Sequence, residues 1–262
     1  MATPRRLVFG DVAELYDRNR PSYPQALVDD LIALAGLGVG RRALEVGAGT
    51  GKATRLLAAR GVSVVAIEPS AEMAAVARRN LAGFPSVEII ETDFERWDPG
   101  PERFALLYSA QAWHWIDPEV RFVRARAALK TGGIFAAFWN RPAWGPTPLR
   151  DELAEVYRRV APDMPTDGPM HPANHASSDD GAWPAEIAAV EGFENAGVRS
   201  YEWHHDYPAQ EYAGLLATLS EIALLDETTR RELVDGVAAA IEAHGGVLAM
   251  PMFTAACLAL AV

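Results

Sequence analysis

Three alternate glycines, Gly47, Gly49 and Gly51, are the residues with the clearest chemical meaning in this sequence. They follow the short apolar run 43–46 and precede Lys52–Arg60, a segment with the composition of a helix. Glycine tolerates positive φ and leaves no side chain between the backbone and a ligand. A turn of this kind, between a strand and a helix at the carboxyl edge of a sheet, can hold a nucleotide-like ligand against its backbone.

The spacing of these glycines argues against two familiar ligand sites. A phosphate-binding P-loop needs glycine where Val46 stands and a hydroxyl residue where Ala53 stands. A dinucleotide fingerprint needs its third glycine where Lys52 stands. A G-x-G-x-G turn remains, with the acidic Glu45 before it. A purely structural turn without a ligand is the alternative interpretation.

Glu68 is an acid at the end of the next β-branched run, Val62–Ile67. It follows the first glycine by about 20 residues, the spacing at which an acid meets a ribose in nucleotide-binding βαβ units. A carboxylate there accepts hydrogen bonds from both ribose hydroxyls and repels a 2′-phosphate. An exposed loop acid is the alternative, because most glutamates are exposed.

Strand-like runs alternate with helix-like segments through the first half of the chain. The strand-like runs are 43–46, 62–67, 87–90, 104–108 and 134–139, and the helix-like segments are 24–35, 52–60, 118–129 and the stretch after Ser70. This alternation predicts an α/β fold, in which helices cover both faces of a parallel sheet. The runs are apolar nearly throughout, which is typical of strands covered on both sides.

The second half is less regular. Helices are expected at 149–160, 183–196, 210–225 and 227–243, and strands at 198–207 and 247–262. The stretch 161–184 is expected to be a long irregular loop. Proline cannot donate to a sheet ladder, so the paired part of the last strand is expected to begin after Pro251.

Together these motifs resemble those of the class I S-adenosylmethionine (SAM)-dependent methyltransferases. The resemblance rests on Glu45 with the glycine turn, on Glu68, and on the stretch Glu91-Thr92-Asp93-Phe94. It implies a Rossmann-like fold with a seven-stranded, mostly parallel sheet, and SAM as the cofactor. In that family the acid at Asp93 meets the exocyclic amine of adenine, and the residue at Phe94 meets the face of its ring.

Two further stretches narrow the resemblance. The segments Tyr16–Pro24 and Ala110–Trp115 are similar to those of the trans-aconitate methyltransferase-type branch, in which an N-terminal Tyr and Arg close over SAM. The residues that the resemblance assigns to the cofactor are Tyr16, Arg20, Gly47, Ala48, Gly49, Thr50, Glu68, Pro69, Asp93, Phe94, Ala110 and Gln111.

The resemblance also implies a domain layout. A single domain would span 1–262, with its core sheet at about 41–140, 197–208 and 247–262 and an N-terminal lid at about 9–35. Insertions at about 143–184 and 209–244 would form a helical cap over the carboxyl edge of the sheet, where ligands bind in open α/β folds. Peripheral decoration is the alternative for both insertions.

The loop after the fourth strand, 109–115, faces the methyl-transfer side in this family. His114 is its only side chain that titrates near neutrality, so it is the predicted catalytic residue, either as a general base or as a hydrogen-bonding group. A carboxylate acceptor needs no base, whereas a phenol, an alcohol or a protonated amine usually does. Trp115, Asn140 and Trp144 are expected to contact the acceptor in an apolar, partly aromatic pocket.

Composition restricts the partners. The chain has 262 residues, a formal net charge of −11 and one cysteine, Cys257. The acidity argues against nucleic acid, and the lone cysteine suits a reducing compartment, so a cytoplasmic protein is expected. The apolar run 247–262 is shorter than the roughly 20 residues of a membrane-spanning helix, so no membrane contact is expected. His171 and His175 flank Pro172 without a third ligand, so no metal is expected.

The predicted function is methyl transfer from SAM to a small organic molecule, with O- or carboxyl-methylation favoured. Three alternatives stay open at this point. They are a SAM-binding protein that senses or scaffolds without methylating, an N- or C-methyltransferase of a natural-product pathway, and an NAD-type oxidoreductase, which the glycine spacing disfavours. The sequence gives no indication of the oligomeric state.

Overall fold

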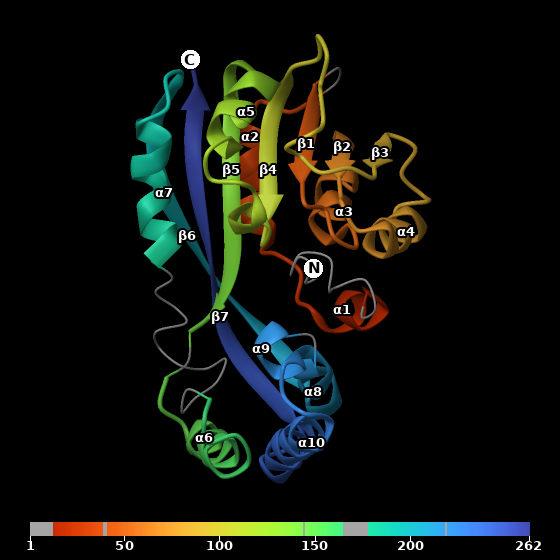
Figure 1. Ribbon diagram of the computed structural model, residues 1–262, viewed down its shortest axis with the longest axis vertical. Coiled ribbons are helices and arrows are strands. Elements are labelled where there is room, and N and C mark those ends of the chain that lie inside the picture. The colour runs from red at the N-terminus through yellow and green to blue at the C-terminus, as the bar shows by residue number, and fades with distance from the viewer. Residues whose placement is uncertain (1–12, 39–40, 144, 165–177, 218) are drawn as a thin grey trace.

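A seven-stranded sheet organises the computed structural model, which describes residues 13–38, 41–143, 145–164, 178–217 and 219–262 (Figure 1). The strand order is β3-β2-β1-β4-β5-β7-β6. Strands β1 to β5 pair in parallel, and β7 runs antiparallel to both β5 and β6. The predicted Rossmann-like α/β fold is confirmed.

The strands are β1 (Arg42–Val46), β2 (Ser63–Ile67), β3 (Val87–Ile90), β4 (Phe104–Ala110), β5 (Leu129–Pro142), β6 (Phe193–Pro208) and β7 (Val247–Ala261). The helices are α1 (Ala13–Asn19), α2 (Gln25–Leu34), α3 (Lys52–Ala58), α4 (Ala71–Asn80), α5 (Arg121–Ala128), α6 (Pro148–Val160), α7 (Ser178–Ala188), α8 (Ala209–Ala217), α9 (Ser220–Ala223) and α10 (Glu227–Ala243). A 3-10 turn, η3, covers Trp113–Trp115.

Two apolar cores cover the two faces of the sheet. On one face, Leu31 of α2 and Leu57 of α3 pack with the strands. On the other, Phe122 of α5 and Ile187 of α7 do so. Two expected boundaries are therefore wrong. The lid at 9–35 extends too far, because α2 is part of the sheet layer, and the cap at 143–184 should not include α7, which packs on the same sheet.

The remaining helices form a second body, which we call the helical lobe and define as α6, α8, α9 and α10 with the ends of β6 and β7 that they cover. It has its own core, in which Tyr157, Leu216 and Leu233 pack against Met250 of β7. Figure 1 shows the lobe beyond the carboxyl ends of β1 and β4. Among the residues that the structure describes, none of the helices has the length and apolar character needed to cross a bilayer.

The β6–β7 pair connects the lobe to the sheet. Its ladder runs from Phe193↔Ala261 to Pro208↔Val247, whereas the β5–β7 ladder ends at Pro142↔Met252. The expectation that pairing starts after Pro251 is wrong, since Pro251 lies opposite His204. Pro251 faces the β5 side, where its carbonyl accepts a hydrogen bond from the N–H of Ala143 at 2.7 Å. Within the described residues the β5 ladder has already ended at Met252, so the missing N–H of the proline costs no ladder bond.

Two helix boundaries also differ from expectation. The helix expected at 183–196 is α7, which lies earlier, because the chain turns at Gly192 with φ +93° and then enters β6. The helix expected at 210–225 is divided into α8 and α9. Both differences shift where the lobe meets the sheet, and α9 brings Glu221 to the cavities described below.

Candidate active site

The glycine turn after β1 has the backbone that its sequence predicts. Gly47, Gly49 and Gly51 have φ values of +73°, +58° and +84°, which only glycine adopts readily. A Cβ at Gly47 would lie 2.4 Å from the Cβ of Ala112, so that position must stay bare. A Cβ at Gly49 would meet nothing within 4 Å. The space beside Gly49 is open, as a ligand-binding turn requires.

Glu68 lies at the tip of β2 and closes onto this turn. Its Oε2 accepts a hydrogen bond from the backbone N–H of Gly49 at 2.7 Å, and its Oε1 accepts one from Ser70 at 2.9 Å. Burial raises the pKa of this carboxyl, and the two N–H groups act in the opposite direction. Glu68 is therefore held beside the turn rather than exposed, as the ribose assignment needs.

A cavity of about 250 Å³, which we call the cofactor cavity, opens beside these groups. Gly47, Gly49, Glu68 and Pro69 form one part of its wall. The loop after β3 contributes Asp93, Phe94 and Glu95, and the loop after β4 contributes Ala110, Gln111, Ala112, His114 and Trp115. The structure thus brings together the loops after β1, β2, β3 and β4, as expected for residues at one edge of a parallel sheet.

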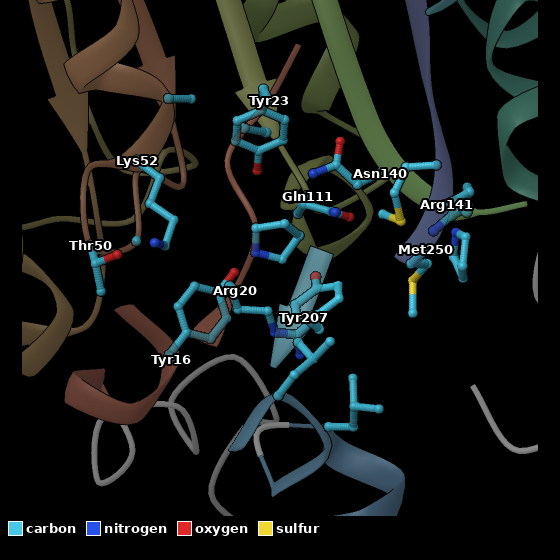
Figure 2. Close-up of a pocket in the computed structure, with 18 of the residues that line it drawn as sticks. Tyr16, Arg20, Tyr23, Thr50, Lys52, Gln111, Asn140, Arg141, Tyr207 and Met250 are labelled. Carbon is cyan, nitrogen blue, oxygen red and sulfur yellow. The ribbon is translucent and has the colours of Figure 1, made fainter. Parts of the chain in front are cut away.

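A second cavity of about 290 Å³, which we call the acceptor cavity, lies between the sheet edge and the helical lobe. It shares eight wall residues with the cofactor cavity: Tyr16, Arg20, Gly47, Gly49, Ala110, Gln111, Leu219 and Glu221. Ala48 and Thr50, predicted to bind the cofactor, line only this second cavity. Figure 2 shows Thr50 and Lys52 on one side and Asn140, Arg141 and Met250 on the other, with Tyr23, Gln111 and Tyr207 between them.

Gln111 stands where the two cavities meet. Its φ is +61°, an uncommon backbone conformation for a residue that is not glycine. Its N–H donates to the carbonyl of Phe138 at 2.9 Å, which fixes the turn after β4. Strained backbone of this kind is concentrated at functional sites, where surrounding structure maintains it.

Glu45 lines the acceptor cavity, and sequence reasoning assigned it no individual role. It is 1% exposed, and its Oε2 accepts hydrogen bonds from Thr54 and, at 2.7 Å, from Tyr108. Its Oε1 is buried without a partner among the described residues. Burial raises the pKa of this carboxyl to about 8, although the two hydroxyl donors lower it. A buried acid with a spare oxygen next to the glycine turn is suited to meet a cationic group of a ligand.

Tyr16 and Arg20 line both cavities from the N-terminal segment. The guanidinium of Arg20 lies 5.1 Å from the centre of the Tyr16 ring. The helix α1 contacts α4 through an ion pair of Glu14 with Arg79. It also contacts α8 at Gly214, where a Cβ would come within 2.6 Å of the Asn19 side chain.

His114 lies in the cofactor cavity and does not line the acceptor cavity. Its Nδ1 accepts a hydrogen bond from the indole N–H of Trp139 at 3.3 Å. An indole nitrogen can only donate, so this contact places the imidazole proton on Nε2. In this geometry His114 offers a hydrogen-bond donor rather than the free Nε2 lone pair that a general base would use.

The described tryptophans near the ends of β4 and β5 lie in different parts of the molecule. Trp113 and Trp139 belong to the apolar core on one face of the sheet, where the ring centroids of Trp139 and Trp183 lie 4.0 Å apart. Trp115, expected at the acceptor, lines the cofactor cavity instead. Trp144 lies outside the described residues. Of the two predicted acceptor contacts that the structure describes, Asn140 lines the acceptor cavity and Trp115 does not.

The other walls of the acceptor cavity come from residues that sequence reasoning did not select. They share no motif and lie far apart in the chain: Tyr23, Lys52, Arg141, Tyr207, Tyr212, Leu215, Leu216, Met250 and Met252. The hydroxyl of Tyr207 is buried without a partner among the described residues. The alternation of side chains along β6 and β7 was the available signal for the residues on these two strands. Such alternation indicates which side chains share a face of the sheet, and it does not indicate that the face borders a cavity.

Comparisons with known proteins agree with this geometry. A family model described as a methyltransferase domain matches residues 43–133. A methyltransferase of Mycobacterium tuberculosis named as uncharacterised is 29% identical over 253 residues, covering 95% of this chain and 93% of the relative. One from Geobacillus kaustophilus, named likewise, is 34% identical over 170 residues, covering 60% of this chain and 78% of the relative. A trans-aconitate 2-methyltransferase of Paracidovorax citrulli is 33% identical over 124 residues, covering 46% and 44%.

Solved structures share the fold. A candidate type II methyltransferase from Anaeromyxobacter dehalogenans superposes with a TM-score of 0.62 at 22% identity, covering 92% of this chain and 96% of the other. A SAM-dependent methyltransferase from Thiobacillus denitrificans, in complex with S-adenosylhomocysteine, gives a TM-score of 0.55 at 16% identity and covers both chains completely (100% and 100%).

Proposed function

This chain belongs to the class I SAM-dependent methyltransferases, and from that premise we propose that it methylates an oxygen atom, preferably of a carboxylate, on a small organic molecule. SAM, when bound, supplies the electrophilic methyl group. The chain supplies binding, alignment and exclusion of water. A relative named trans-aconitate 2-methyltransferase adds support, because trans-aconitate is itself a carboxylate.

The side chains in the cofactor cavity fit SAM. Glu68 is a buried carboxylate suited to ribose hydroxyls, and Gly49 leaves open space beside it. Asp93 and Phe94 suit the adenine ring, as in the family. Glu45 lines the adjoining acceptor cavity beside the glycine turn, where its spare Oε1 suits the ammonium of the methionine moiety, and Arg20, which lines both cavities, suits its carboxylate.

The observation that carries the proposal is that the two cavities share one wall. A ligand held by Glu68 and Asp93 at one end reaches Gly47 and Gln111, beyond which the acceptor cavity begins. That cavity is bounded on one side by the lobe, and its volume of about 290 Å³ accommodates a small molecule. An acceptor placed there would face the cofactor at the residues that line both cavities, which would align it for direct transfer.

A carboxylate acceptor does not depend on a base, although Glu45, Lys52 and Glu221 also line the acceptor cavity. No histidine lines the acceptor cavity among the described residues, and three of its four tyrosines, Tyr23, Tyr207 and Tyr212, have pKa values raised by burial. They remain neutral donors at physiological pH. A carboxylate is already nucleophilic and needs no proton removed, so this set of side chains suffices for it.

The test is methyl transfer from SAM carrying a labelled methyl group to a panel of carboxylic acids, phenols and amines. We expect S-adenosylhomocysteine and a base-labile methyl ester from at least one acid. SAM binding without transfer to any oxygen acceptor would contradict the proposal and favour a binding protein. Transfer to amines alone would make the enzyme an N-methyltransferase.

A further inference from the structure

A buried chain of hydrogen bonds crosses three strands behind the acceptor cavity. The indole N–H of Trp203 on β6 donates to Oγ1 of Thr254 on β7 at 3.0 Å. The Thr254 hydroxyl donates to Oδ1 of Asn140 on β5 at 2.7 Å. The Nδ2 of Asn140 donates to the carbonyl of Ser22 at 2.8 Å. Thr254 has no exposed surface, and Asn140 is 7% exposed and lines the acceptor cavity.

The groups at both ends of this chain of hydrogen bonds can act in one way only, either as donor or as acceptor. The Trp203 indole can only donate, so the Thr254 oxygen accepts from it and must use its own proton on Asn140. The Ser22 carbonyl can only accept, so the NH₂ group of Asn140 must face it. Reversing the amide would set the Asn140 oxygen against the Ser22 oxygen. The direction of the amide is therefore determined by its neighbours.

A fixed amide determines what the cavity offers to a ligand. The NH₂ group of Asn140 has two hydrogens, and one is used by Ser22. No second hydrogen bond of this nitrogen falls within the described residues, and the side chain borders the acceptor cavity. Figure 2 shows the Asn140 nitrogen directed toward the side of the cavity where Tyr23 lies. The cavity thus meets its ligand with an N–H donor at this point.

We infer that Asn140 is a specificity-determining residue that selects an oxygen lone pair over an ammonium group, and that Thr254 is the positioning residue that holds it in this sense. The inference rests on the proposed function, because it takes the acceptor to occupy this cavity. The apolar side chains Leu216, Met250 and Met252 on the same walls fit an acceptor with an apolar body. The preferred class is therefore an apolar acid.

The test uses two probes of matched shape, 3-phenylpropionate and 3-phenylpropylamine, with the protein saturated with S-adenosylhomocysteine. Calorimetry on the wild type should give at least tenfold tighter binding of the acid. Other charged side chains of the cavity also act on the probes, since Arg20, Lys52 and Arg141 favour an anion and Glu45 and Glu221 oppose one. The decisive contrast is therefore between two variants. Thr254→Ser keeps both hydrogen bonds and should bind the acid within twofold of wild type. Thr254→Val removes the donor to Asn140 Oδ1, so that Ser22 alone holds the amide, and should bind the acid about five- to tenfold more weakly, the equivalent of one lost hydrogen bond.

Affinity for S-adenosylhomocysteine should be the same in all three proteins, which separates a change in the acceptor cavity from general misfolding. If Thr254→Val does not fold, Thr254→Ala replaces it. Equal binding of acid by the Val and Ser variants, tighter binding of the amine, or no binding of the acid would each overturn the inference. The proposed function is judged separately by turnover with SAM, so loss of turnover with the Thr254 contrast intact would point to failure of the function alone.

Discussion

The two cavities share a wall but are built in different ways. The cofactor cavity is formed by loops that directly follow parallel strands β1 to β4, between residues 46 and 116 apart from the lid and the edge of the lobe. The acceptor cavity draws on residues from Tyr16 to Met252, including three strand ends and two lobe helices. The first is local in sequence and the second is assembled by the tertiary fold.

The difference teaches where chemical constraint acts. SAM is one molecule with a fixed shape, so its site needs particular backbone angles, as at Gly47 and Gly49, and a buried acid, Glu68. The acceptor side needs only a cavity of the right size with a few directed polar groups, which side chains on many scaffolds can provide. We therefore expect mutations to separate the two cavities cleanly.

The largest expected effect concerns pH and Glu45. Its pKa is about 8 in the folded protein against 4.5 for an ordinary glutamate, so the folded state holds an extra proton between these values. Stability contributed by this group is complete below about pH 4.5 and is lost as the pH rises toward 8. The free energy of unfolding should fall by roughly 2–5 kcal/mol across that window, at about 1.4 kcal/mol per pKa unit.

Denaturant titrations at several pH values measure this loss. Glu45→Gln, which keeps a neutral side chain of the same shape, should flatten the dependence. An unchanged pH profile in Glu45→Gln would show that another group is responsible. The exposed Glu88→Gln is the control and should leave the profile of the wild type intact.

Next in size is Glu68→Ala. Removing the carboxylate deprives the ribose hydroxyls of a charged acceptor, a contact of about 1.5–3 kcal/mol, so affinity for SAM should fall at least tenfold. Binding of 3-phenylpropionate in the acceptor cavity should change little. Calorimetry measures both. Unchanged SAM affinity would refute the ribose assignment, whereas equal losses for both ligands would mean that the cavities are not separable.

A smaller effect is expected at Gly214, where α8 approaches Asn19 of the lid. Alanine usually stabilises a helix relative to glycine by about 1 kcal/mol. In Gly214→Ala the new methyl group would displace α1, so SAM affinity should fall about three- to fivefold while the melting temperature stays level or rises. Gly83→Ala is the control, because a Cβ there meets nothing within 4 Å. Wild-type affinity for SAM in Gly214→Ala would show that the packing of α1 against α8 does not contribute to SAM binding.

The smallest effect is expected for His114→Ala. Its Nδ1 is engaged by Trp139 and its ring lies in the cofactor cavity, so turnover should fall less than tenfold. A general base would instead be worth about 10²–10⁴-fold. Steady-state rates with an identified acid decide between them. The exposed His204→Ala on β6 should have no effect, and a loss above a hundredfold at His114 alone would restore it as the base.

The sheet and the cofactor residues could be predicted because each depends on neighbours in sequence. Alternate glycines after an apolar run define a turn, and an acid at the next strand end follows from the geometry of a βαβ unit. Tyr207 and Met250 could not be found this way. They face the acceptor cavity only because β6 and β7 pair over a long ladder and the lobe helices cover their ends, which depends on contacts between distant segments.

His114 illustrates how sequence reasoning can select a residue type without its environment. A titratable side chain in the right loop suggested a base, but its role depends on Trp139, which reaches it from β5. Trp115 and Trp113 likewise differ in burial although they are two positions apart, because a 3-10 turn sends one into the core and the other toward the cavity.

The position of β7 between β5 and β6 has a consequence for how the chain reaches this structure. Among the described strands, β6 pairs with β7 alone, and β7 follows it only after the whole of α8, α9 and α10. During synthesis β6 must therefore wait, with its ladder groups hydrated, until β7 leaves the ribosome. The cofactor half can fold before that moment. The acceptor cavity cannot, so newly made chains should gain the capacity to hold SAM before they gain a place for its acceptor.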